Sequence, residues 1–220
     1  MILINFKAYE ETFGDKAVEL AKICKEASEE TGVEIIPVVS ALDVYRVKKE
    51  AGNKKVYIQA VDNITAGAHS GSIAAEAAKL AGADGCLINH SEKRLPPGTI
   101  KQLLERLPET WDKIVCIQTM GQAERWAKGL KATYFAYEPS ELIGSTEKSV
   151  ASEKSQIIRK AVEMLAPTPV LVGAGIHSPE DVKVSLEMGA KGLLIATNIV
   201  KSKQPKDDLR KLAEVFVRGI

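Results

Sequence analysis

The sequence predicts an α/β protein in which eight parallel strands and their helices form a single (β/α)8 barrel domain over residues 1–220. Three observations lead to this prediction. Short apolar runs alternate strictly with segments of helical spacing, eight times in succession, which favours a parallel sheet closed into a barrel. No linker divides the chain, and its length suits one barrel domain. One helix-to-strand junction occurs twice in nearly the same form.

The predicted strands are short apolar runs bounded by Gly, Pro or polar residues, as expected for strands that are buried on both faces. They cover residues 2–6, 33–39, 55–60, 85–89, 113–118, 132–137, 169–172 and 192–196.

Apolar residues recur at helical spacing between these strands. The first helix is expected over residues 15–31, with Gly32 ending it. A later helix has Ser178 as its N-cap, Pro179 in its first position and Asp181 completing a capping box. The other helices are expected at residues 42–51, 73–80, 97–107, from the end of the fifth strand through 130, 151–165, and from 206 to the C-terminus.

The repeated junction supports a fold built from equivalent units. It reads Gly82-Ala83-Asp84-Gly85-Cys86-Leu87-Ile88 and again Gly189-Ala190-Lys191-Gly192-Leu193-Leu194-Ile195. The alternative fold is an open doubly wound sheet. Its dinucleotide-binding fingerprint is missing, because Ser178 stands where a third glycine should follow Gly173 and Gly175. We therefore favour the closed barrel.

Composition excludes several classes of protein. The 30 basic and 29 acidic residues give a net charge of +1, and no basic run is interleaved with aromatic residues, so we expect no nucleic-acid partner. No segment approaches the ~20 apolar residues of a membrane helix, and we expect a cytoplasmic protein with no membrane partner. The three cysteines fit neither a disulfide framework nor a zinc site, and buried reduced thiols are expected.

The stretch of residues 134–144 has the composition of a strand that leads into a lid. An aromatic run places Glu138 where Pro139 must end the strand, because proline cannot donate to a ladder. Leu142 and Ile143 would form an apolar tip, and Gly144 would let the backbone approach a ligand. A carboxylate under such a lid would be a good proton acceptor. The alternative is an edge strand that ends in a solvated glutamate.

Unusual polar and small residues fall at the carboxyl ends of the predicted strands, where barrels of this kind carry their working residues. They are Asn5 and Lys7 after the first strand, His90 after the fourth, Glu138 after the sixth, Gly173, Ala174 and Gly175 after the seventh, and Ala196 and Thr197 after the eighth. Their common placement predicts proton abstraction beside a carbonyl. A carboxylate would take the proton, a histidine and a lysine would stabilise charge on oxygen, and backbone N–H groups would bind an anion such as phosphate.

Four motifs at these positions resemble those of one enzyme family. They are Asn5-Phe6-Lys7; Asn89-His90-Ser91-Glu92-Lys93-Arg94; Tyr137-Glu138-Pro139 with Ile143-Gly144; and Gly173-Ala174-Gly175-Ile176. Together they resemble triosephosphate isomerase, and the resemblance covers the whole chain. It implies the TIM barrel fold and is greatest to the compact archaeal branch of the family.

The resemblance also implies roles for individual residues. Glu138 would shuttle the proton between the two carbons of dihydroxyacetone phosphate and glyceraldehyde 3-phosphate, and neutral His90 would act as the electrophile. Lys7 and Asn5 would hold the substrate, with Glu92 behind them near Lys7 and His90. The phosphate would rest on backbone N–H groups of Gly144, Gly173, Ala174, Gly175, Ala196 and Thr197. No metal or organic cofactor is implied.

The long loop of residues 61–72 implies self-association. In the family it inserts into a neighbouring subunit beside the catalytic lysine, so we expect a dimer or, as in some compact relatives, a tetramer. The chain departs from the family pattern at Ser70-Gly71-Ser72 in this loop, at Ser145-Thr146-Glu147 in the lid and at Ala196-Thr197-Asn198 after the eighth strand. Two other functions stay open: a barrel enzyme acting on a longer phosphosugar, and a non-catalytic protein that binds a phosphate-bearing ligand.

Overall fold

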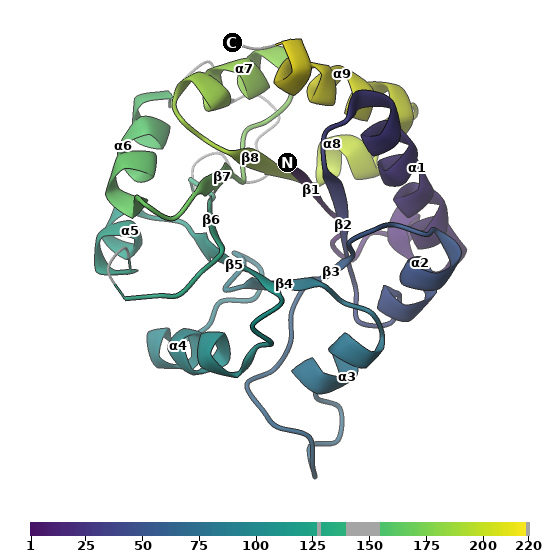
Figure 1. The fold of residues 1–220 in the computed structure, drawn as a ribbon, viewed down its shortest axis with the longest axis vertical. Helices are drawn as coiled ribbons and strands as arrows, with labels where there is room; N and C mark the ends of the chain where they lie inside the picture. Colours follow the sequence, from purple (N-terminus) through teal and green to yellow (C-terminus); the bar gives the residue numbers. More distant parts are fainter. Residues whose placement is uncertain (127–128, 140–154, 219–220) are drawn as a thin grey trace.

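The computed structural model describes residues 1–126, 129–139 and 155–218, and these form one closed parallel barrel (Figure 1). Each strand pairs with its neighbours in chain order, and β1 closes the ring against β8. The predicted barrel is therefore confirmed. The strands are β1 (Ile2–Asn5), β2 (Ile35–Val39), β3 (Tyr57–Ile58), β4 (Gly85–Ile88), β5 (Asp112–Ile117), β6 (Tyr134–Tyr137), β7 (Val170–Val172) and β8 (Gly192–Ile195).

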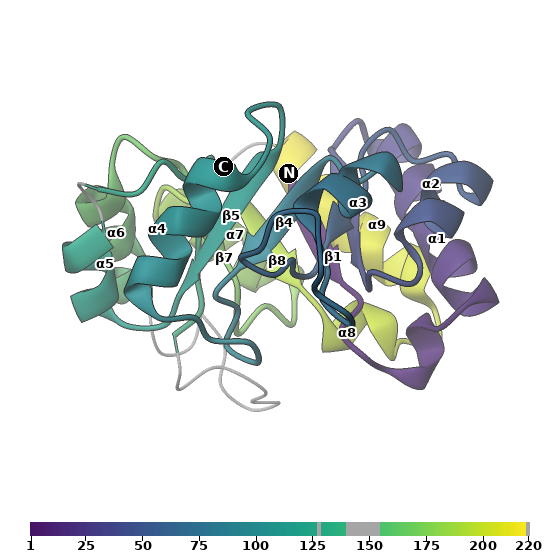
Figure 2. The ribbon, with the colours of Figure 1, turned by 90° about the horizontal axis from the view of Figure 1, so that it is seen from below.

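Helices surround the strands as an outer ring, with α9 packed beside α1 so that the last helix completes it (Figures 1 and 2). They are η1 (Glu10–Thr12), α1 (Asp15–Thr31), α2 (Val44–Glu50), α3 (Ala75–Leu80), α4 (Pro97–Arg106), α5 (Met120–Trp126), α6 (Ser155–Leu165), α7 (Pro179–Glu187), α8 (Thr197–Val200) and α9 (Pro205–Arg218). None of the helices in the described part of the chain is long and apolar enough to cross a membrane.

The strands are apolar on both faces because each face meets a separate part of the core. Leu3, for example, points into the barrel, where it pairs in register with Ile36 of β2 and Leu194 of β8. Its neighbours Ile2 and Ile4 point outward, into the larger core between the strands and the helices. The alternation along each strand thus fills the interior of the barrel and attaches the helices.

The repeated junction has the same geometry in both copies. Gly82 and Gly189 follow helices with φ of +99° and +95°, a conformation that favours glycine. Gly85 and Gly192 then begin β4 and β8 where no Cβ would fit, since one at Gly85 would lie 2.7 Å from the Asp112 carbonyl oxygen and one at Gly192 would strike the Met1 backbone. The repeated sequence therefore corresponds to two equivalent places where the backbone of one strand lies very close to the backbone of its neighbour.

Most elements lie inside the predicted ranges or within one residue of them, and the Ser178 capping box of α7 is confirmed. Two predictions were incomplete. The strand expected over residues 55–60 pairs only at Tyr57 and Ile58, although the Gln59 N–H still donates to the Val39 carbonyl at 3.0 Å. The short helices η1 and α8 were not predicted, because elements of three or four residues show no periodicity.

Candidate active site

The strand ends bring the predicted polar residues to one end of the barrel. Asn5 is the last residue of β1, His90 comes two residues after β4, and Glu138 follows β6 directly. All three side chains are buried. Asn5 and His90 are 85 positions apart in the sequence, and His90 and Glu138 are 48 positions apart, yet each pair is in contact. The reason is that parallel strands present their carboxyl ends to the same face.

The central contact joins Glu138 and His90. The Oε1 atom of Glu138 lies 3.1 Å from Nε2 of His90, and the two residues are only 3% and 8% exposed. At this separation the carboxylate and the imidazole ring are in direct polar contact at a buried position. A carboxylate and an imidazole in contact at a buried site can pass protons to and from a ligand between them.

The groups around the His90 ring favour one tautomer. The backbone N–H of Glu92 points at Nδ1 from 3.3 Å, and because an amide N–H only donates, Nδ1 is the acceptor. In the neutral ring Nε2 then carries the hydrogen, on the side that faces Oε1 of Glu138. The side-chain nitrogen of Asn5 lies 3.4 Å from the same Nε2 atom, and because an amide nitrogen only donates, a hydrogen bond between these two atoms needs the other tautomer. We assign the hydrogen to Nε2 because the contact with the Glu92 N–H is shorter and Nε2 faces the Glu138 carboxylate.

Lys7 is held by its backbone as well as by its side chain. Its φ of +52° is a strained value for a residue other than glycine. Two hydrogen bonds stabilise that conformation: the Lys7 N–H donates to Oδ1 of Asn5 at 3.0 Å, and Nε2 of Gln59 donates to the Lys7 carbonyl at 2.8 Å. The ammonium then donates to Oε1 of Glu92 at 2.7 Å. Strain at this position is consistent with a fixed cation facing the site.

Glu92 lies beside both Lys7 and His90. Its second carboxylate oxygen is 3.7 Å from Nδ1 of His90, and its side chain is 57% exposed. The carboxylate thus anchors the Lys7 ammonium from the solvent side, and the Glu92 backbone orients the ring.

Three polar side chains near the site were given no role by the sequence analysis: Gln59, Asn89, which it named only as part of a motif, and Gln118. Asn89, with φ of +62°, donates to the Cys116 carbonyl at 2.9 Å and accepts from the Leu95 N–H at 2.8 Å, and so fixes the turn that carries His90. Gln118 places Nε2 3.5 Å from Oε2 of Glu138. Gln118 directly follows β5. The rule that selected Glu138, that working residues lie at the carboxyl ends of strands, applies to it as well (the strand-end rule).

Gly173 leaves room for the Glu138 side chain. A Cβ on Gly173 would lie 2.6 Å from Cγ of Glu138, a distance that real Cβ contacts do not show. The Gly173 N–H already donates to the Tyr137 carbonyl at 2.8 Å, so this group belongs to the sheet. From the sequence we expected the Gly173 N–H to bind phosphate, but this N–H is already bonded to the Tyr137 carbonyl. What Gly173 contributes to the site is space, because it has no side chain beside Glu138.

The remaining residues predicted to bind an anion follow β7 and β8. Ala174 is buried, and Gly175 has a φ of +72°. Ala196 precedes α8, and Thr197 begins it with its Oγ1 3.0 Å from the hydroxyl of Tyr9. Gly144 and the lid positions 145–147 lie outside the described residues.

A cavity of about 380 Å³ opens beside Lys7 and His90. It extends away from the barrel axis toward the loops after β2 and β3, where Ser40, Leu42 and Ile73 line it. A hollow of this size accepts a small ligand.

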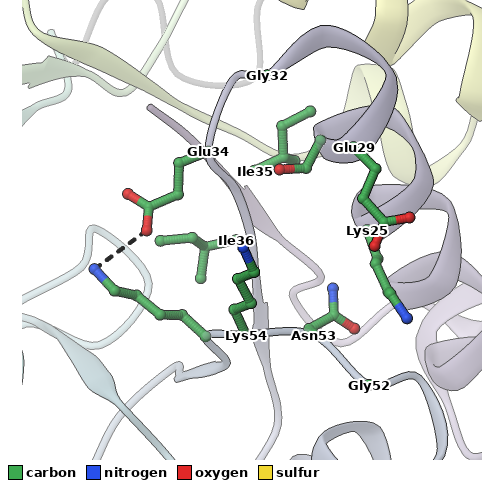
Figure 3. Close-up of a pocket in the computed structure, with 11 residues that line it drawn as sticks. Lys25, Glu29, Gly32, Glu34, Ile35, Ile36, Gly52, Asn53 and Lys54 are labelled. Atoms are coloured by element: carbon green, nitrogen blue, oxygen red, sulfur yellow. Dashed lines mark ion pairs between the residues drawn. The ribbon is translucent and has the colours of Figure 1, made fainter.

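A second cavity, of about 500 Å³, lies at the opposite end of the barrel, where the strands begin (Figure 3). At its edge the Lys55 ammonium lies 3.2 Å from Glu34 and 3.0 Å from Asp112, which also accepts from the Tyr57 hydroxyl. Burial and this carboxylate raise the pKa of Tyr57. Since this end of such barrels serves stability, we assign the catalytic role to the other end.

Within the described ranges, no group of three or more His, Cys, Asp or Glu side chains could hold a metal ion. All three cysteines are free and buried, as expected. Burial raises the pKa of the Cys116 thiol well above its ordinary value, and the Glu138 carboxylate raises it further.

The fold and the site together define a (β/α)8-barrel enzyme with a buried carboxylate–imidazole pair at the carboxyl ends of its strands. Comparison with known proteins agrees. The family described as triosephosphate isomerase matches residues 1–215. A triosephosphate isomerase of Methanothermus fervidus is 40% identical over 217 residues, which are 96% of each chain. One of Saccharolobus solfataricus is 39% identical over 221 residues, covering 99% of this chain and 94% of the relative.

The fold comparison extends further. A crystal structure of triosephosphate isomerase from Bartonella henselae matches with a TM-score of 0.73 at 18% identity, over 98% of both chains, and so shares the fold. The sequence matches also show the family, because they combine high coverage with an identity of about 40%. The chain belongs to the triosephosphate isomerase family, a family of aldose–ketose isomerases.

Proposed function

We propose that this protein is a triosephosphate isomerase that interconverts dihydroxyacetone phosphate and D-glyceraldehyde 3-phosphate through an enediolate, with no cofactor. The observation that carries the proposal is the buried contact of 3.1 Å between Glu138 and His90. It joins a base and a neutral hydrogen-bond donor at the carboxyl ends of β6 and β4. Membership of the family supplies the substrates.

Glu138 is the base in this mechanism. Its carboxylate takes a proton from one carbon of the substrate and returns it to the neighbouring carbon. In the free protein its Oε1 atom lies 3.1 Å from Nε2 of His90, the proposed donor. A substrate carbonyl entering the site takes over that donor, which leaves the carboxylate oxygen free to accept a proton.

His90 and Lys7 stabilise the negative charge that develops on oxygen. The Nε2–H donor is already aimed into the site, because the Glu92 N–H holds the opposite nitrogen. The Asn5 amide nitrogen, 3.4 Å from Nε2, offers a second donor to the same oxygen. Lys7 adds a fixed positive charge, and Glu92 keeps it in place through the 2.7 Å contact.

The substrate phosphate is proposed to rest on backbone N–H groups of Ala174, Gly175, Ala196 and Thr197. The hydrogen bond between Thr197 and Tyr9 supports this arrangement, since it ties the segment after β8 to the loop after β1. Gly144, which lies outside the described residues, is proposed to contribute another N–H from the lid.

The test is turnover of glyceraldehyde 3-phosphate in a coupled assay, with Glu138→Gln beside the wild type. We expect activity in the wild type and its loss in Glu138→Gln, which keeps the size of the side chain and removes the base. The matched control Glu105→Gln, at an exposed position of α4, should retain full activity. No turnover by a folded wild type would refute the proposal, and turnover only of a longer phosphosugar would favour the alternative enzyme.

We also propose that the chain associates with itself through the loop of residues 61–72. Residues 65–72 are exposed and project from the barrel below α3 in Figure 1. The base of the loop is fixed, because the Asp62 N–H donates to the Ile73 carbonyl and the Ile73 N–H donates to Asp62, both at 2.8 Å. The cavity beside Lys7 offers a place for the same loop of a second copy.

Sedimentation equilibrium tests this second proposal. Replacing residues 65–71 by a short glycine linker should give monomers of low activity, whereas the wild type should sediment as a dimer or tetramer. A monomeric wild type, or a loop variant with unchanged association, would exclude the loop as the interface.

A further inference from the structure

Gln118 occupies a position between the two central residues of the site. It directly follows β5, and so lies between the end of β4, which leads to His90, and the end of β6, which leads to Glu138. Its side chain is 3% exposed, which is unusual for a glutamine. A buried amide at the centre of a barrel end must find partners on the neighbouring strands.

The Gln118 amide nitrogen has one partner on each side. Nε2 lies 3.3 Å from the carbonyl oxygen of Asn89, the residue that precedes His90. The same nitrogen lies 3.5 Å from Oε2 of Glu138. Because a side-chain amide nitrogen carries two hydrogens, it can donate to both acceptors at once. The amide therefore links the segment of the histidine to the carboxylate itself.

The orientation of this amide follows from its surroundings. Turning it over would place Oε1 against the Asn89 carbonyl and the Glu138 carboxylate, which are both acceptors. In the observed orientation Oε1 is buried and has no hydrogen-bond partner among the described residues. A buried acceptor without a partner lowers the stability of the fold. The favourable contribution of this amide therefore comes from the two hydrogen bonds that its nitrogen donates.

The Gln118 backbone is held independently of the side chain. Its N–H donates to Oε1 of Gln122 at 2.7 Å, and the Thr119 N–H approaches the same oxygen at 3.3 Å. These contacts fix the start of α5 and do not involve Glu138. The side chain of Gln118 is therefore not needed to shape its own turn, and its effect on Glu138 can be tested separately.

We propose that Gln118 is a positioning residue for the proton transfer: its amide holds Oε2 of Glu138 and the backbone before His90 at a fixed separation. This inference rests on the proposed function, in which Glu138 is the base. When substrate takes the Nε2–H donor of His90, Oε1 of Glu138 loses its partner. The bond from Gln118 to Oε2 then keeps the carboxylate aimed at the substrate carbon.

The role predicts an effect on kcat rather than on KM. In the proposed function, substrate affinity depends on the phosphate contacts and on Lys7. Among the described residues the hydrogen bonds of the Gln118 side chain go to Asn89 and Glu138 and to none of these groups. Proton transfer depends on the carboxylate direction, and misplacing a reacting group by about 1 Å can cost about 100-fold in rate. Loss of the Gln118 donors should therefore slow turnover and leave binding unchanged.

The test compares Gln118→Met with Gln122→Met. Gln118→Met keeps the length and volume of the side chain and removes both donors together with the unsatisfied Oε1. We expect kcat to fall by about 10- to 100-fold. KM and the inhibition constant of inorganic phosphate should stay within about twofold of the wild type, and Tm should not fall. Gln122→Met removes the acceptor for two backbone N–H groups, so it should lower Tm and leave kcat near the wild-type value.

Gln118→Asn provides a partial rescue. It retains the amide but is one methylene shorter, so it can reach one of the two acceptors and not both. Its kcat should lie between those of Gln118→Met and the wild type. Crystal structures of the variants with a substrate analogue bound give a readout that does not depend on activity, and in Gln118→Met the Glu138 carboxylate should leave the position that it has in the wild-type complex while His90 stays.

Wild-type kcat in Gln118→Met would overturn the inference, and so would a Glu138 carboxylate that stays in place in the crystal structure of that variant with the analogue bound. An equal loss of kcat in Gln122→Met would also overturn it, because the effect would then belong to the turn as a whole. Absence of turnover in the wild type would instead refute the proposed function, and the crystal structures would still decide whether Gln118 holds Glu138.

Discussion

The space beside Gly173 makes a sharp test of how tightly the base is confined. Gly173 follows β7 next to the end of β6, and its hypothetical Cβ lies 2.6 Å from Cγ and 3.5 Å from Cδ of Glu138. The backbone there has an ordinary φ, so alanine adds steric contact without conformational strain. Gly173→Ala therefore adds one methyl group that must displace the Glu138 side chain.

The size of the effect follows from the contact distance. Carbon atoms approach favourably to about 3.5–4.0 Å, so Cγ of Glu138 must retreat by about 1 Å. A displacement of that size should lower kcat by about 100-fold, or about 2.7 kcal/mol of activation free energy. Overpacking the buried site should lower the free energy of unfolding by about 1–3 kcal/mol.

The assay is kcat for glyceraldehyde 3-phosphate, with urea unfolding of the same samples. Gly98→Ala is the matched control, since nothing lies within 4 Å of its Cβ position in α4. It should leave kcat unchanged and raise the free energy of unfolding by about 0.4–1 kcal/mol. A Gly173→Ala protein with kcat within about twofold of the wild type would refute the claim that Glu138 is confined on this side.

Three further predictions concern other parts of the chain. Glu138→Asp, which withdraws the carboxylate by one methylene, should reduce kcat far more than it changes KM, and a change in KM alone would contradict the role of base. The hydrogen bond from the Ile73 N–H, together with the charge of Lys93, lowers the pKa of Asp62 in the folded protein. The bond therefore stabilises the loop at pH values above the unfolded pKa of about 3.9, and this stability is lost as pH falls through the lower pKa of the folded protein. The protection of the Ile73 amide, measured as its exchange rate relative to the intrinsic rate at the same pH, should accordingly be lost as pH falls below the ordinary Asp value of about 3.9 in the wild type, with no such step in Asp62→Asn. Burial raises the pKa of Cys24 and Cys86 to about 12, so a disulfide reagent at pH 8 should label neither thiol until urea unfolds the protein.

The elements and the choice of barrel could be predicted from the sequence because they depend on local patterns. Helical spacing with Gly32 at its end gave α1, and the capping box at Ser178 gave the start of α7. The strand-end rule selected Asn5, His90 and Glu138, since topology alone places those positions on one face. The family motifs added the roles proposed for them.

Other features depend on contacts between distant parts of the chain and required the tertiary structure. The ring tautomer of His90 follows from a bond to the Glu92 N–H, and the strained φ of Lys7 is stabilised by Gln59, 52 residues away. The function of Gly173 as space for Glu138 is visible only when β6 and β7 lie side by side.

Gln118 shows the difference most clearly. Its position after β5 can be read from the sequence, but its two acceptors come from the segments after β4 and β6. Local sequence determines where each strand ends and which side chain stands there. Closure of the barrel determines which of those side chains meet and at what distance, because hydrogen bonds and contacts act only over a few ångströms.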